Sequence, residues 1–155
     1  MEHITEGAIA PQFTGKDQDG RNVSLKDFKG KKVILYFYPK DDTPGCTAEA
    51  CNLRDNYDDL LSRGFAIIGV SPDDEKSHGK FKTKFELPFS LIADPEKAII
   101  KAYGAWGEKS MYGKTYEGVL RTTFVIDESG KIQKIISKVN TGDHTKQILE
   151  LLGIN

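Results

Sequence analysis

Cysteine is scarce in this sequence: two occur among 155 residues, at Cys46 and Cys51. One disulfide closing so short a loop would be a weak framework for a domain of this size, because disulfide stabilisation grows with the length of the closed loop. A small secreted scaffold built on disulfides is therefore excluded. Two neighbouring thiols in a reducing compartment indicate redox chemistry instead.

Long apolar runs and an excess of one charge are also missing. No stretch approaches the roughly 20 apolar residues of a membrane span, and residues 1–10 have neither the basic nor the apolar segment of a signal peptide. We therefore expect a cytoplasmic protein. Lysine and arginine number 22 and aspartate and glutamate 23, giving a net charge of -1. This balance predicts no nucleic-acid or membrane partner and favours a small, roughly neutral one.

The chain carries no repeat, low-complexity tract or linker, so we expect a single domain over residues 1–155. The strongest strand signal is the apolar run Val33–Tyr38, which predicts a strand in the middle of a sheet. Further strands are expected at Phe65–Val70, Ser90–Ile92, Thr122–Asp127 and Ile132–Lys138, the last two forming an antiparallel hairpin. Helices are expected over Pro44–Ser62, Asp73–Phe85, Pro95–Tyr103 and Asp143–Leu152.

This order of elements predicts an α/β sandwich with a right-handed crossover between parallel strands and an antiparallel hairpin at one side. The thioredoxin fold meets this description. An additional N-terminal hairpin is expected between Phe13 and Val23, because Gln18-Asp19-Gly20 is a turn signal.

The first cysteine falls in the first turn of an expected helix. Thr43 is a natural N-cap and Pro44 suits the first helical position, which places Cys46 among N–H groups that have no partner within the helix. These groups and the helix dipole stabilise a thiolate, and the thiolate is the nucleophilic form.

A helical projection separates the two thiols. Cys46 shares an apolar stripe with residues that fall within about 40° of it, so its sulfur should point toward the sheet, whereas Cys51 lies about 140° away and should be more exposed. A plain core cysteine is the alternative for Cys46, and the Thr-Pro-Gly approach argues against it. The stripe contains Ala50, Leu53, Tyr57 and Leu60, and the opposite, solvated face is expected to contain Glu49, Arg54, Asp55, Asp58 and Asp59.

The segment YFYPKDDTPGCTAEAC resembles the peroxiredoxins, and among them the bacterioferritin comigratory (BCP/PrxQ) subfamily. It contains the family's Pro-x3-Thr-x2-Cys signature as Pro39, Thr43 and Cys46, with the subfamily's second cysteine at Cys51. The resemblance runs along nearly the whole chain, through GVSPD, WGEKSMYGKTYEG and the segment RTTFVID that begins at Arg121.

The resemblance implies a thioredoxin-dependent thiol peroxidase active in antioxidant defence, which reduces hydrogen peroxide and organic hydroperoxides to water and alcohols. Cys46 would attack the peroxide, Thr43 and Arg121 would hold the reacting oxygens, and Pro39 would shield the pocket from water. Cys51 would resolve the sulfenic acid as an intramolecular disulfide, the atypical 2-Cys mechanism, and a thioredoxin-like dithiol would reduce it. No metal, flavin or haem is expected, and the protein is expected to be a monomer.

Arg121 is supported from the residues as well. It opens a strand which, if antiparallel beside Val33–Tyr38, begins near the helix of Cys46, where a guanidinium would stabilise both a thiolate and a developing alkoxide. An ordinary surface arginine is the alternative. A disulfide oxidoreductase and a redox-sensing or chaperone module are the rival functions, and the Cys-x4-Cys spacing argues against the first.

The remaining polar groups are interpreted as structural. The histidines His3, His78 and His144 lie among polar residues, and nothing pairs them with either cysteine. Asp41-Asp42 and Asp73-Asp74-Glu75 could suggest a cation, but helix caps are the better interpretation. Trp106 is expected to pack rather than to contact a reductase.

Overall fold

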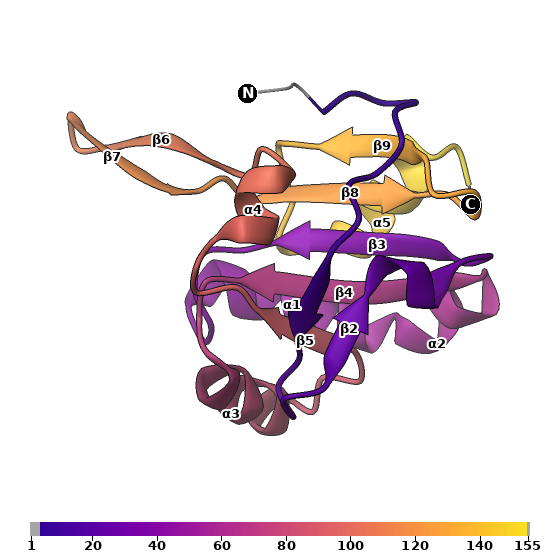
Figure 1. Ribbon diagram of the computed structural model, residues 1–155, viewed down its shortest axis with the longest axis horizontal. Helices are drawn as coiled ribbons and strands as arrows, with labels where there is room; N and C mark the ends of the chain where they lie inside the picture. Colours follow the sequence, from indigo (N-terminus) through magenta and orange to yellow (C-terminus); the bar gives the residue numbers. More distant parts are fainter. Residues whose placement is uncertain (1–3, 155) are drawn as a thin grey trace.

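The structure, a computed structural model, describes residues 4–154. Its centre is a seven-stranded mixed sheet in the order β2-β1-β5-β4-β3-β8-β9, and β6 and β7 form a separate two-stranded sheet. Helices lie on both sides of the large sheet (Figure 1). This is the α/β architecture that the order of elements predicts.

The strands are β1 (Thr14–Lys16), β2 (Asn22–Ser24), β3 (Lys32–Phe37), β4 (Phe65–Ser71), β5 (Ser90–Ala93), β6 (Trp106–Met111), β7 (Lys114–Val119), β8 (Thr122–Ile126) and β9 (Ile132–Ile136). The α-helices are α1 (Pro44–Asp55), α2 (Tyr57–Ser62), α3 (Glu75–Phe85), α4 (Ala98–Ala102) and α5 (His144–Leu151), and a short 3-10 helix, η1, spans Leu25–Phe28. No helix among these is long and apolar enough to cross a membrane.

Strand β3 lies in the interior of the sheet, as its apolar sequence predicts. It pairs in parallel with β4 and antiparallel with β8. Its side chains alternate between two cores: Leu35 enters one and Tyr36 enters the other. Because both faces of β3 are covered, the strand has no polar side to interrupt its hydrophobic run.

Different helices cover the two faces of the sheet. The first core includes Ile100 of α4, which lies in front of the sheet in Figure 1, together with Phe13 from the N-terminal segment. The second core includes Cys46 of α1, Phe81 of α3 and Ile148 of α5. Cys46 therefore lies in a layer built from helices far apart in the sequence.

The expected long helix Pro44–Ser62 is wrong in its continuity. It is two helices, α1 and α2, because Asn56 leaves the helical conformation (φ -109, ψ 13) and its side-chain amide donates to the carbonyl of Asn52 at 2.8 Å. Asparagine side chains compete with the helical hydrogen bonds in this way. The helix expected from Pro95 is also shorter, since Lys97 adopts a left-handed conformation (φ 62) and α4 begins only after it.

Two hairpins were expected and a third was missed. The expected hairpins are confirmed by the antiparallel pairing of β1 with β2 and of β8 with β9. The third hairpin, β6 and β7, turns at Tyr112 and Gly113, which both have positive φ, as a tight two-residue hairpin turn requires. It extends away from the large sheet (Figure 1). The sequence analysis predicts no strand here, because both strands mix charged residues with glycine and lack an apolar run.

Candidate active site

Cys46 lies in the first turn of α1 and is only 1% exposed, so its sulfur faces inward as the helical projection predicts. Thr43 occupies the N-cap position with an extended backbone, but its hydroxyl donates to the carbonyl of Lys40 at 2.8 Å and accepts no N–H of the helix. The first turn therefore has no side-chain cap. Its N–H groups keep the partial positive charge that favours an anion near Cys46.

Arg121 joins the start of β8 to α1. Strand β8 runs antiparallel to β3, and Thr122 is paired with Phe37, so the residue before β8 lies next to the end of β3 that leads to α1. The Nη2 atom of Arg121 donates to Cys46 Sγ at 3.3 Å. A half-buried guanidinium in contact with the sulfur stabilises the thiolate.

A glycine makes this approach possible. A Cβ atom at Gly45 would lie 3.2 Å from Nη2 of Arg121, which is tighter than nearly all real contacts of a Cβ atom. Any side chain at Gly45 would therefore press against the guanidinium that contacts Cys46.

Glu49 corrects the sequence analysis, which placed it on the solvated face of α1. Its side chain is fully buried, and Oε1 accepts a hydrogen bond from Nη1 of Arg121 at 2.8 Å. Residues three apart on a helix share a face, so Glu49 lies beside Cys46. Burial raises the pKa of Glu49 to about 7, although the charge of Arg121 opposes the shift.

His144 was also missed. It begins α5, is fully buried, and its Nε2 atom lies 3.5 Å from Oε2 of Glu49. Its sequence neighbours are polar, and the partners that bury it come from β8 and α1, distant in the chain, so local composition carried no signal of its burial.

Pro39 and Thr43 belong to the segment that connects β3 to α1, and both are half-buried. Asp41 lies in this loop between β3 and α1 and holds it in place. It is buried and is not the helix cap that the sequence suggested. Its Oδ1 atom accepts a hydrogen bond from the hydroxyl of Tyr38 at 2.6 Å, and its Oδ2 atom accepts one from Ser77 at 2.8 Å.

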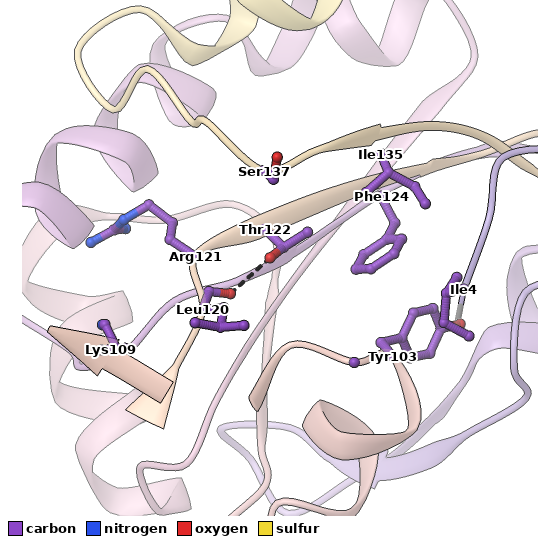
Figure 2. A pocket seen from close by; sticks show the side chains of 10 residues that line it. Ile4, Tyr103, Lys109, Leu120, Arg121, Thr122, Phe124, Ile135 and Ser137 are labelled. Carbon is purple, nitrogen blue, oxygen red and sulfur yellow. Dashed lines mark hydrogen bonds between the residues drawn. The ribbon is translucent and has the colours of Figure 1, made fainter. Parts of the chain in front are cut away.

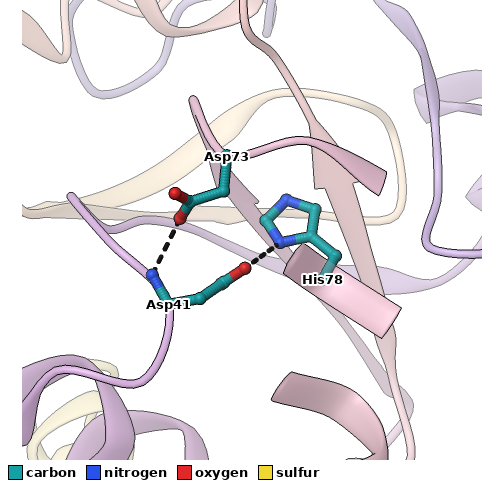
Figure 3. A group of neighbouring side chains, drawn as sticks. All are labelled: Asp41, Asp73 and His78. Atoms are coloured by element: carbon teal, nitrogen blue, oxygen red, sulfur yellow. Dashed lines mark hydrogen bonds and ion pairs between the residues drawn. The ribbon is translucent and has the colours of Figure 1, made fainter. Parts of the chain in front are cut away.

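His78 lies next to Asp41 and Asp73 (Figure 3) and is also buried. Its Nδ1 atom lies 2.7 Å from Oδ2 of Asp41, and its Nε2 atom lies 3.0 Å from the carbonyl of Ile92. Both ring nitrogens face acceptors, so the ring is held at each end. Asp73 also accepts the backbone N–H of Asp41 at 2.8 Å. Asp41, Asp73 and His78 lie close enough to suggest a metal site, but they already bind one another and the backbone.

Cys51 lies on the same regular helix as Cys46, is half-buried, and both cysteines are free thiols. Five residues of α-helix place the Cα atoms about 8.7 Å apart, more than the roughly 7 Å that a disulfide tolerates. Two side chains next to Cys51 anchor this part of α1. Asn52 accepts the backbone N–H of Thr145 of α5 at 2.8 Å, and Arg54 donates to the carbonyl of Phe85 at 2.8 Å.

A cavity of about 620 Å³ borders Arg121 on the other side, between β8, β9 and the residues that follow α4. Its apolar walls include Tyr103, Phe124 and Ile135. Figure 2 shows the Arg121 side chain extended away from these residues, and Cys46 is not part of the lining. The cavity is therefore separate from the sulfur.

Trp106, at the start of β6, is half-buried and packs against the first core. The Nζ atom of Lys97 lies 4.9 Å from its ring centroid, within the range of a cation–π contact. These contacts favour the packing interpretation.

A buried cysteine in the first turn of a helix, contacted by an arginine on an α/β sandwich, is typical of a thiol-based redox enzyme. The sequence profile of the AhpC/TSA family matches residues 7–135. Peroxiredoxin Bcp of Escherichia coli K12 is 43% identical over 152 residues, which are 98% of this chain and 97% of that protein.

Solved structures agree. The bacterioferritin comigratory protein of Xanthomonas campestris is 33% identical, with a TM-score of 0.84 over 91% of this chain and 90% of that one. PrxQ of Xylella fastidiosa is 27% identical, with a TM-score of 0.90 over 99% and 98%. The chain belongs to the AhpC/TSA family and resembles its Bcp/PrxQ peroxiredoxins, which confirms both the resemblance and the thioredoxin-like fold.

Proposed function

We propose that this thiol peroxidase uses Cys46 as its nucleophile, with Arg121, Thr43 and Pro39 forming the pocket for the peroxide. The Cys46 thiolate attacks one peroxide oxygen, the O–O bond breaks, and water or an alcohol leaves after taking up a proton. The sulfur becomes a sulfenic acid. The observation that carries this proposal is the 3.3 Å contact of Arg121 with the buried sulfur of Cys46.

Arg121 has two tasks in this scheme. Its charge keeps Cys46 in the thiolate form before attack, and the same donors lie where negative charge develops on the leaving oxygen. Thr43, whose hydroxyl donates within the loop, can turn its oxygen toward the substrate without uncapping α1, because that helix does not depend on it.

We also propose that Cys51 is the resolving cysteine of an atypical 2-Cys mechanism. It condenses with the sulfenic acid, and water is released as the disulfide forms. The helix geometry requires α1 to unwind first, which breaks the anchors that Asn52 and Arg54 provide. A dithiol protein of the thioredoxin class then attacks the disulfide and restores both thiols.

The range of substrates follows from the relatives. The Xanthomonas campestris protein reduces alkyl peroxides, and we propose that this chain accepts organic hydroperoxides as well as hydrogen peroxide. We propose that it acts as a cytoplasmic monomer, since nothing in its charge balance favours nucleic acid or a membrane as partner.

Three substitutions test the roles. Cys46→Ser should abolish peroxide consumption, whereas Cys51→Ser should consume a single equivalent and stop at a trappable sulfenic acid. Arg121→Ala should slow the reaction of Cys46 with peroxide by about 10²-fold, the loss expected for one donor at a developing oxyanion. Stopped-flow kinetics with hydrogen peroxide and an alkyl hydroperoxide measure this rate.

Two outcomes would contradict the proposal. Normal turnover of Cys51→Ser with thioredoxin would remove Cys51 from the mechanism. Thiol exchange without peroxide would identify the protein as a disulfide oxidoreductase.

A further inference from the structure

A buried acid and a buried base, Glu49 and His144, lie next to each other on the side of Arg121 that binds Glu49; they are called the Glu49–His144 pair. Both side chains are fully buried, one on α1 and the other on α5. Arg121 donates to Oε1 of Glu49, but among residues 4–154 Oε2 has no hydrogen-bond partner, and the nearest ring nitrogen, Nε2 of His144, is 3.5 Å away. An unpartnered carboxylate oxygen at full burial is costly, so its protonation state matters.

The tautomer of His144 follows from its other contacts. Gln147 donates through Nε2 to the carbonyl of Lys138 at 2.7 Å, and its Oε1 accepts the N–H of Asn140 at 2.7 Å. Oε1 of Gln147 is therefore an acceptor, and Nδ1 of His144, 2.9 Å away, must carry a proton. In the neutral ring, Nε2 is then the lone-pair atom, which accepts the hydroxyl of Thr123 at 2.8 Å.

If Glu49 were ionised, its Oε2 atom would face the lone pair of Nε2, and the two acceptors would repel each other. One proton on either group turns the contact into an attraction. Burial raises the pKa of Glu49 to about 7 and lowers that of His144 to about 4, so the proton resides on Glu49 at weakly acid pH. The other titratable groups that face the pair are Arg121, Cys46 and Tyr36, and burial raises the pKa of Tyr36 so far that it stays neutral.

We propose that His144 is a positioning residue of the peroxidase site: it holds the second oxygen of Glu49 and keeps one proton on the Glu49–His144 pair, which leaves the charge of Arg121 to the Cys46 sulfur. The inference rests on the proposed role of Cys46. A protonated Glu49 accepts from Arg121 without competing for its charge, whereas an ionised Glu49 is a second anion beside the thiolate. The two groups share one contact, so a proton on either of them removes the repulsion between the carboxylate oxygen and the lone pair of Nε2.

The test measures the pH dependence of Cys46 alkylation by iodoacetamide in the Cys51→Ser background. His144→Gln supplies an amide N–H that can donate to Oε2 of Glu49 but cannot accept a proton, so it stabilises the ionised carboxylate. The midpoint of alkylation should move up by about one pH unit, which lowers the rate up to about tenfold on the acid side. In the matched background Glu49→Gln, which is neutral at every pH, the same His144→Gln change should leave the midpoint in place.

Two results overturn the inference: an unmoved midpoint in folded His144→Gln, or an equal shift when Glu49 is already Gln. A third measurement needs no variant. Carbon-13 NMR of the Glu49 carboxyl in the unaltered protein should show titration near neutral pH, and titration near the ordinary value of about 4.3 would overturn the proposal even if His144→Gln does not fold. Peroxide consumption is assayed in parallel, so an inactive Cys46 would refute the proposed function while the titration still decides the role of His144.

Discussion

The protein contains two buried carboxylate–histidine pairs, which differ in how completely their polar atoms are hydrogen-bonded. In the pair of Asp41 with His78, three donors converge on the carboxylate and both ring nitrogens face acceptors. In the Glu49–His144 pair, one carboxylate oxygen has a donor and the other lies 3.5 Å from a ring nitrogen that already accepts a hydroxyl. The saturated pair fixes a loop, whereas the unsaturated pair leaves one buried carboxylate oxygen without a hydrogen bond among the described residues.

The largest effect should come from breaking the saturated pair. Asp41→Asn would place an amide N–H where the carboxylate now accepts hydrogen bonds from two hydroxyls and the ring of His78, and removing one partner of a buried pair costs about 3–5 kcal/mol. Chemical denaturation should show this loss in the free energy of unfolding. The neighbouring Asp42→Asn is the control, because Asp42 is exposed and forms an ion pair with the exposed Lys84, a contact worth at most about 1 kcal/mol. Equal losses in both variants would show that Asp41 does not hold the loop between β3 and α1 in place.

The unsaturated pair should show itself in the pH dependence of stability. A raised pKa at Glu49 makes the folded state less stable as pH rises from about 4.5 to about 7, because there the folded protein binds more protons than the unfolded chain. A lowered pKa at His144 has the opposite sign, with stability lost as pH falls from 6.5 toward about 4. Where the two windows overlap, the contributions cancel in the unaltered protein.

Glu49→Gln removes only the first contribution. The free energy of unfolding of this variant, relative to the unaltered protein, should therefore rise with pH across that overlap, by on the order of 2 kcal/mol. Denaturation series at several pH values measure the slope. A difference that does not change with pH would mean that Glu49 is not the group that titrates.

The smallest effect lies outside both pairs. Asn52→Ala removes the side chain that accepts the N–H of Thr145 in the first turn of α5, which should cost about 1 kcal/mol. Because this bond also ties down the segment of α1 that must unwind, the Cys46 to Cys51 disulfide should form faster after a pulse of peroxide. Quenched-flow trapping of free thiols measures that rate. An unchanged rate would show that Asn52 does not restrain α1.

The sequence predicted the central architecture because its signals are local. The unbroken apolar strand β3, the turn signals of the hairpins at either end, and Thr43-Pro44 before Cys46 all act within a few residues. Neither buried pair was predicted, because the partners are distant in the chain. Asp41 contacts His78 of α3, and Glu49 contacts Arg121 and His144 from the last third of the sequence. A charged residue three positions after Cys46 shares its face, and that spacing was the available clue for Glu49.

The place of Glu49 on α1, between the two cysteines, has a consequence for the order of events. The proposed nucleophile, the buried acid beside it and the proposed resolving thiol occupy one stretch of six residues, 46–51. The segment cannot keep Cys46 and Glu49 around Arg121 while it brings the two sulfurs within bonding distance. Under the proposed mechanism, the covalent connectivity of the chain makes the peroxide-reacting conformation and the disulfide-forming conformation mutually exclusive, so each molecule would need a reductant before it could react again.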